Sequence, residues 1–115
     1  MPSNLTELPG NFDGRHFSTY VDQVKTLRRL KRDDCAAALL LRLLPVIEEE
    51  AVSRGPRWPV APWYYEQLAI IYKKAKRFED EVGILKRYVD AHACIEEKPF
   101  EKLVQRLQKA ELGLR

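Results

Sequence analysis

The fold is decided by residues 65–88, which read YEQLAIIYKKAKRFEDEVGILKRY. Residues 20–43, YVDQVKTLRRLKRDDCAAALLLRL, carry the same pattern 45 residues earlier. The matching positions are Tyr20, Val24, Leu27, Lys31, Arg32, Ala36, Leu40, Arg42 and Leu43 against Tyr65, Ala69, Tyr72, Lys76, Arg77, Glu81, Leu85, Arg87 and Tyr88. A pattern that recurs at a fixed spacing usually marks a stacked supersecondary unit, because one unit cannot bury its apolar face alone. The sequence therefore predicts an all-α fold of stacked antiparallel helical hairpins.

The hydrophobic spacing predicts about five helices. Apolar residues recur at three- and four-residue steps between clusters of turn formers, which is the period of an amphipathic helix. We expect helices over residues 17–30, 34–53, 62–76, 78–95 and 99–112. Ser18 is the expected N-cap of the first helix, and Pro45 is expected to bend or end the second. Pro62 and Pro99 are expected to open the third and fifth helices.

This pattern of helices predicts a single domain preceded by a short N-terminal arm. The expected organisation is an irregular arm over residues 1–15 and a domain over 16–115, with hairpins 17–53 and 62–96 and a terminal capping helix 99–112. Pro9, Gly10 and Gly14 disfavour regular structure in the arm. Phe12 is the candidate that anchors the arm to the body.

Composition favours a chain with anionic partners, but only weakly. The 115 residues include 20 Lys and Arg against 17 Asp and Glu, which gives a net charge of +3. This excess is far below that of a dedicated nucleic-acid arm. Cys35 and Cys94 have no metal-ligand spacing and are expected to be free thiols in a reducing compartment. The start of the chain has no signal-peptide pattern, and the longest apolar stretch, residues 36–44, is too short to span a bilayer. We therefore predict a cytoplasmic protein with no membrane partner.

The sequence shows no motif for catalysis. It contains no Gly-rich phosphate loop, nucleophile elbow or metal motif, and no paired carboxylates stand out. His16 and His92 have no cysteine or carboxylate neighbours at metal-ligand spacing. We therefore predict that the chain is not an enzyme and that it needs no cofactor and no metal.

One repeat resembles a known family. Tyr65, Leu68, Ala69 and Tyr72 reproduce the aromatic, leucine, small residue and tyrosine that mark the first helix of a tetratricopeptide repeat. Phe78 matches the aromatic of the turn, and Leu85 matches an apolar position of the second helix. Glu81 departs from this pattern, because the family has a small residue there. The quartet begins again 35 residues further on, at Phe100, Leu103, Val104 and Leu107. The resemblance implies a tetratricopeptide-like α-solenoid.

This resemblance also implies where a partner binds, since the first helix of each hairpin lines the concave face of such solenoids. The candidate partner-binding residues are Lys25, Arg28, Arg29, Trp63, Glu66, Ile70, Lys73 and Lys74. Arginine can bind a carboxylate through two parallel hydrogen bonds, lysine adds a point charge, and tryptophan offers a flat anchor. We therefore predict a non-catalytic protein–protein interaction module that binds an acidic or carboxylate-bearing peptide in a basic concave groove.

Several alternatives stay open. Lysine and arginine near helix C-termini can simply complement the helix dipole, which suits Lys31, Arg32, Lys76 and Arg77. Trp63 can pack with Trp58 under the Pro-rich loop instead of binding a partner. Two other functions remain: nucleic-acid binding through a basic edge (residues 25–32 and 73–77), and a homodimer or larger scaffold sealed by the tryptophans or the last helix.

Overall fold

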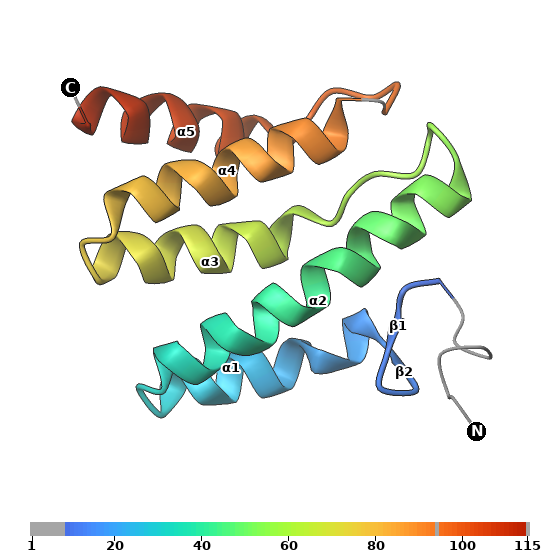
Figure 1. The fold of residues 1–115 in the computed structure, drawn as a ribbon, viewed down its shortest axis with the longest axis horizontal. Helices are drawn as coiled ribbons and strands as arrows, with labels where there is room; N and C mark the ends of the chain where they lie inside the picture. The colour runs from blue at the N-terminus through green and yellow to red at the C-terminus, as the bar shows by residue number, and fades with distance from the viewer. Residues whose placement is uncertain (1–8, 94, 115) are drawn as a thin grey trace. The chain divides into compact units, whose positions relative to one another are not determined.

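In the computed structural model, which describes residues 9–93 and 95–114, helices make up most of the chain (Figure 1). Five α-helices and one short β-hairpin lie in the described residues, so the predicted all-α class is confirmed apart from that hairpin. The chain divides into two compact units, Met1–Arg54 and Gly55–Arg115. Residues 1–8 of the predicted arm and Cys94 lie outside the described residues.

The first unit opens with the β-hairpin, which corrects the prediction of an irregular arm. β1 (Asn11–Phe12) pairs antiparallel with β2 (Arg15–His16). Asp13 and Gly14 connect the strands with φ angles of 54° and 80°. A two-residue hairpin turn requires positive φ at both positions, and Asp-Gly is among the pairs that adopt it most readily. This dipeptide was therefore the sequence signal for the hairpin.

Phe12 anchors the arm, as predicted. The Tyr20 hydroxyl donates a hydrogen bond of 2.6 Å to the Phe12 carbonyl, and the two rings meet edge to face at 5.7 Å. The Arg42 guanidinium lies 5.4 Å from the centre of the Phe12 ring. A 3-10 helix, Phe17–Tyr20, follows the hairpin, and its N-cap is His16 in place of the predicted Ser18, because the His16 ring accepts from the Ser18 backbone N–H.

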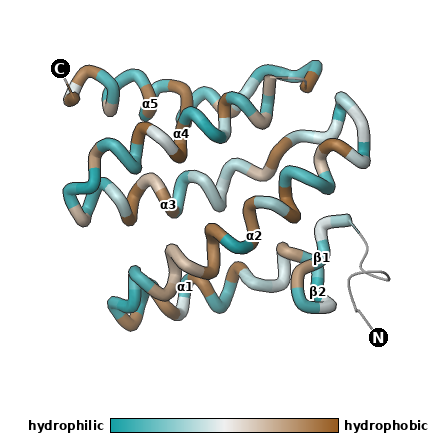
Figure 2. The backbone as a smooth tube through the Cα atoms, viewed as in Figure 1, coloured by the Kyte–Doolittle hydropathy of each residue, from teal (hydrophilic) through white to brown (hydrophobic). Residues whose placement is uncertain are grey.

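Two helices complete the first unit. They are α1 (Val21–Arg29) and α2 (Asp33–Arg54), which pack against each other. Hydrophobic residues fill much of the middle of α2 (Figure 2), and its side chains Leu40, Leu43 and Leu44 are buried. The helix continues through Pro45 to Arg54, close to the predicted range 34–53, so of the two expected effects of this proline, a bend or an end, the structure excludes the end. The proline removes the hydrogen bond to the Leu41 carbonyl, but both residues are exposed, and water can solvate that carbonyl.

The second unit is a helical hairpin followed by one more helix. Its helices are α3 (Pro62–Lys74), α4 (Phe78–His92) and α5 (Glu101–Gly113); α3 packs on α4, and α4 packs on α5. The rings of Tyr65 and Tyr88 lie 5.3 Å apart, which joins α3 to α4. The Tyr88 hydroxyl also accepts a hydrogen bond of 2.8 Å from the Phe100 backbone N–H, and this fixes the start of α5.

The ends of these helices differ by a few residues from the prediction. α3 ends at Lys74 rather than residue 76, α4 ends at His92 rather than residue 95, and α5 begins at Glu101 with Phe100 as its N-cap. Pro99 therefore precedes the fifth helix and does not open it. Pro62 does open α3, as predicted.

The repeated Lys-Arg pair forms the same turn in both units. Lys31 and Lys76 have φ angles of 59° and 60°, in the left-handed region. Arg32 donates a backbone hydrogen bond of 2.8 Å to the Leu27 carbonyl, and Arg77 donates one of 2.8 Å to the Tyr72 carbonyl. This is the Schellman end of a helix, which satisfies carbonyls that the last turn leaves unpaired. The sequence repeat therefore corresponds to a repeated local structure.

Candidate partner-binding groove

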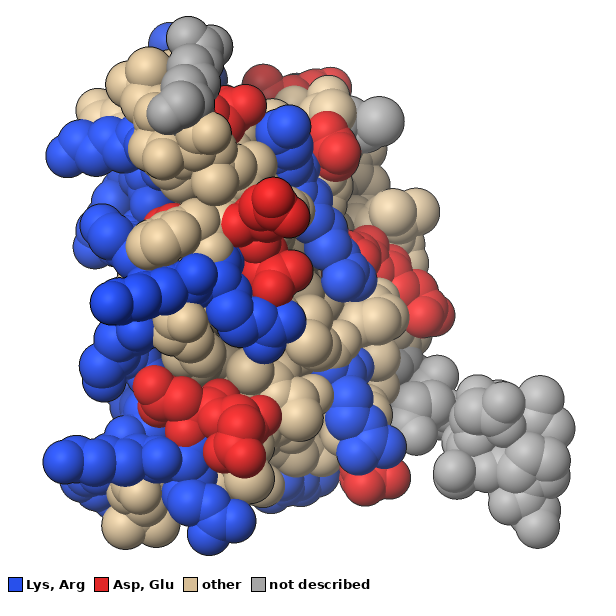
Figure 3. Space-filling model, turned by 60° about the vertical axis from the view of Figure 1, so that its left-hand side comes forward, with Lys and Arg blue, Asp and Glu red and all other residues tan. Residues whose placement is uncertain are grey.

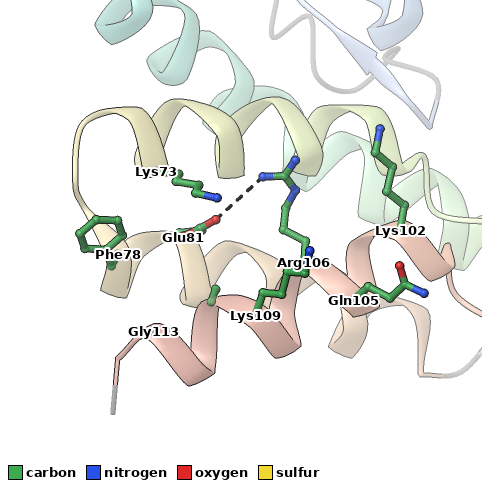
Figure 4. Close-up of a pocket in the computed structure, with 9 residues that line it drawn as sticks. Lys73, Phe78, Glu81, Lys102, Gln105, Arg106, Lys109 and Gly113 are labelled. Atoms are coloured by element: carbon green, nitrogen blue, oxygen red, sulfur yellow. Dashed lines mark ion pairs between the residues drawn. The ribbon is translucent and has the colours of Figure 1, made fainter.

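A groove of about 490 Å³ runs between α3, α4 and α5 in the second unit (Figure 4). Its lining residues are Lys73, Phe78, Glu81, Lys102, Gln105, Arg106, Lys109, Ala110 and Gly113. In Figure 4, Phe78 and Gly113 lie at one end, Lys102 and Gln105 lie at the other, and Glu81 lies between them. We call the first of these the Phe78 end.

The helical period explains how α5 builds most of this lining. Lys102, Arg106, Lys109 and Gly113 follow one another at steps of four, three and four residues, which places them on one face of the helix. Leu103, which is fully buried, lies on another face and holds α5 in place. The basic face of α5 is thereby left open to the groove.

The other two helices contribute their ends. Lys73 lies in the last turn of α3, where a cation also interacts favourably with the helix dipole. Glu81 lies in the first turn of α4, where the helix dipole favours a negative charge. Phe78 is the first residue of α4 and is 44% exposed, which is unusual for a large aromatic side chain.

The groove carries four cations and one carboxylate, so its charge is positive. Glu81 is buried, and its carboxylate lies 4.0 Å from Arg106 Nη1, a distance at the limit of an ion pair. Lys102 binds Glu66 with an Nζ–Oε2 distance of 3.0 Å. Lys73 and Lys109 are exposed and form no ion pair with any residue that the structure describes. These two lysines are therefore available to an anionic ligand.

The predicted residues of α3 fall into two groups. Lys73 lines the groove, and Glu66 reaches the groove through its ion pair with Lys102. Trp63, Ile70 and Lys74 do not line it; Trp63 is half-buried and packs edge to face on Tyr64 at 5.0 Å. The Glu66 side chain is only 14% exposed and already paired, and its role as a partner contact stays a prediction.

The predicted residues of α1 belong to the first unit. Lys25 and Arg29 are exposed, and Arg29 donates a hydrogen bond of 3.3 Å to the Thr26 hydroxyl within the same helix. Arg28 is half-buried with its Nε 3.9 Å from Asp33. The groove of the second unit does not include these three residues in its lining. Their role in binding stays a prediction.

Sequence reasoning missed most of the groove. Phe78 was assigned to the turn, and Lys102, Arg106 and Lys109 were not singled out. Two signals pointed to them: the cations of the last helix recur on one helical face, and Glu81 replaces the small residue of the resembled repeat.

A second buried carboxylate lies in the first unit and is closed off. Glu50 is 1% exposed; its Oε2 lies 2.7 Å from His16 Nε2, and its Oε1 lies 3.3 Å from Arg54 Nε. Because His16 Nδ1 accepts from the Ser18 backbone N–H, its Nε2 carries the proton and donates to Glu50. Gly10 covers this carboxylate so closely that a Cβ there would overlap it. This cluster fastens the arm to α2.

Burial also changes the acidity of tyrosines in the second unit. Burial raises the pKa of the Tyr64 hydroxyl to about 12. Burial likewise raises the pKa of Tyr72, which the Arg77 charge lowers in part, and the pKa of Tyr88. The phenolate is poorly solvated at all three positions, so these hydroxyls stay neutral at physiological pH and contribute no charge to the groove.

The comparisons with known proteins return no match: no family model, no curated protein and no solved structure is similar to this chain. The described helices include none that is both long and apolar enough to cross a membrane.

Proposed function

We propose that this chain is a non-catalytic interaction module that binds an acidic segment of a partner protein in the groove of its second unit. The observation that carries this proposal is the pair of exposed lysines, Lys73 and Lys109, on facing sides of a hollow that also holds Arg106. Cations that converge on one concave surface without acidic partners attract carboxylates and guide them to that surface. The tetratricopeptide-like arrangement of α3, α4 and α5 is part of the same proposal.

The chemistry of the lining supports binding over a reaction. Lysine, arginine, glutamine, phenylalanine, alanine and glycine surround a single glutamate. This set can hold an anion by charge and hydrogen bonds and can pack an apolar group against Phe78. It makes the groove a surface for holding a segment in place.

The surface charge also favours a peptide over nucleic acid. Figure 3 shows acidic side chains interspersed among the lysines and arginines on the displayed face. A phosphate backbone carries a regular row of negative charges and binds best to a continuous basic track. Nucleic-acid binding and self-association therefore stay as predictions, and the experiment below tests the first of them.

The test is fluorescence anisotropy with a labelled peptide rich in Asp and Glu. We expect wild-type protein to bind it, and a Lys73→Glu/Lys109→Glu variant to lose about tenfold or more in affinity, because each reversal turns an attraction into a repulsion. The matched control is Lys25→Glu/Arg29→Glu, which changes the net charge equally but alters α1. Circular dichroism checks that both variants keep their helices.

Equal losses of affinity in the two double variants would show that only net charge matters, and they would contradict binding of the peptide in the groove. Failure of the wild-type protein to bind any acidic peptide would overturn the proposed function. A single-stranded oligonucleotide in the same assay tests the nucleic-acid alternative, and tighter binding of the oligonucleotide than of the peptide would favour it.

A further inference from the structure

We infer that the Phe78 end is the anchor of the groove, and that it takes a carboxylate side chain next to an aromatic or large aliphatic side chain of the partner. This inference rests on the proposed function and narrows the class of partner. It divides the groove into a binding part, with Phe78 at its end and Lys73 and Lys109 toward its middle, and a supporting end, with Lys102 and Gln105.

The two parts of the groove differ in whether their cations already have a carboxylate partner. Lys102 already has a carboxylate partner at 3.0 Å, and Arg106 has Glu81 at 4.0 Å. A ligand that binds these two groups must compete with an acid of the chain itself. Lys73 and Lys109 have no such competitor among the described residues. A new carboxylate therefore gains most between these two lysines.

An apolar contact is available at the same end. Phe78 exposes 44% of its surface there, and burying an exposed aromatic face is favourable in proportion to the apolar area covered. Charge alone would leave that ring in water. A ligand that places an aromatic or aliphatic side chain on Phe78 beside its carboxylate satisfies both features at once.

The α5 residues at this end leave room for such a side chain. Ala110 and Gly113 are the small residues of the groove lining, and a Cβ built on Gly113 would have no other atom within 4 Å. At the other end the lining consists of the long side chains Lys102 and Gln105. The lining of α5 is therefore made of small residues toward the end where Phe78 lies.

The charges also indicate how acidic the ligand is. Of the four cations, two are balanced by Glu66 and Glu81, which leaves the charge of Lys73 and Lys109. Two carboxylates, or one carboxylate near a second acidic residue, neutralise this charge. A short acidic motif with one large apolar residue is the partner chemistry that fits.

The inference is tested with two labelled peptides of equal net charge, one with a tryptophan beside its acidic residues and one with serine in its place. We expect the tryptophan peptide to bind about tenfold more tightly to the wild-type protein, as expected for one buried aromatic side chain. In a Phe78→Ala variant this advantage should vanish while the serine peptide binds as before. Phe78 is exposed, so the variant should fold, and thermal unfolding checks this.

Two further variants separate the ends of the groove. Lys109→Ala should weaken both peptides several-fold, whereas Lys102→Ala, the matched control on the same face of α5, should change affinity by less than about threefold. Equal effects of these two variants would overturn the inference, as would equal binding of the two peptides to the wild-type protein. Those results leave the proposed function standing, because an acidic peptide still binds.

A phosphoserine version of the serine peptide identifies the anion. Tighter binding of the phosphopeptide than of the tryptophan peptide would contradict a carboxylate anchor, because a phosphate carries more charge but no apolar group. Absence of binding by every peptide would overturn the proposed function and this inference together.

Discussion

Glu50 and Glu81 are both buried carboxylates in a helix, and their surroundings are opposite. Glu50 has two close partners, His16 at 2.7 Å and Arg54 at 3.3 Å, and the backbone of Gly10 closes over it. Among the residues that the structure describes, Glu81 has one distant ion-pair partner, Arg106 at 4.0 Å, and it lines a hollow of about 490 Å³. The first carboxylate belongs to the structure of its unit, and the second lies beside space that a ligand can enter.

This comparison shows that burial alone does not indicate a site. A buried charge whose hydrogen bonds are all made, and which has no space beside it, has a structural role. It stabilises the fold only if its hydrogen bonds and ion pairs outweigh the free energy lost when the charge is removed from water. A buried charge with one loose partner beside open cations keeps its surroundings available for binding. The difference between the two units should therefore appear in stability for Glu50 and in affinity for Glu81.

The largest effect on stability is expected at Gly10, whose backbone lies against the Glu50 carboxylate. A Gly10→Val change should lower the free energy of unfolding by about 3 kcal/mol, because its side chain overlaps the Glu50 carboxylate and its φ of +86° disfavours a branched residue. Gly113→Ala is the matched change in the open groove and should leave stability unchanged or slightly raised. Urea unfolding measures both, and equal losses would contradict the contrast between a closed and an open carboxylate.

A direct comparison of the two carboxylates comes next. Glu50→Gln should cost about 2 kcal/mol, because it weakens the bonds to His16 and Arg54 in a buried position. Glu81→Gln should cost less than about 1 kcal/mol, because its ion pair is loose, and it should strengthen binding of an acidic peptide. A larger loss of stability at Glu81 than at Glu50 would reverse our interpretation.

Alkaline pH should weaken the second unit through Tyr64. Burial raises the pKa of this hydroxyl from its ordinary value of 10.0 to about 12, so the folded state disfavours the phenolate. Its contribution to stability is complete below about pH 10 and is lost as the pH rises toward 12, which amounts to about 2 kcal/mol. Urea unfolding of the wild-type protein and of Tyr64→Phe at neutral and alkaline pH measures this. The difference between the two proteins cancels the effects of pH that both share. A difference that stays constant with pH would disprove it.

The smallest effect concerns the turns that the two units share. Lys31→Gly and Lys76→Gly should each raise the free energy of unfolding by about 0.5–1 kcal/mol, because glycine adopts the left-handed conformation at the end of a helix without strain. Thermal unfolding checks the two variants side by side. A gain at only one of them would mean that the two turns are not equivalent, despite their matching hydrogen bonds.

Much of the fold could be predicted from the sequence. The three- and four-residue spacing of apolar residues located all five helices, and the repeated Lys-Arg pair marked the two equivalent turns. The hairpin of the arm was missed, although Asp13-Gly14 is a strong turn signal, because its strands are only two residues long. Helix ends shifted by one to four residues, since caps depend on local hydrogen bonds that spacing does not show.

The groove could be predicted only in part. Lys73 was predicted from its place on α3 and does line the groove. The lining residues on α5 were missed, because no spacing rule places a side chain of the last helix opposite one on α3. Lys102 has an ion-pair partner, and Lys109 has none among residues 9–93 and 95–114. This difference depends on which acid lies within about 4 Å, and that is a property of packing.

The central claim is that an acidic segment binds at the Phe78 end of the second unit. The most direct measurement is an NMR titration of the isotopically labelled protein with the tryptophan-containing acidic peptide, because it observes both units at once. We predict that the largest amide shifts occur at Lys73, Phe78 and Lys109 and saturate with the peptide. Largest shifts at Lys25, Arg28 and Arg29 of α1, or no saturable shift, would contradict the account.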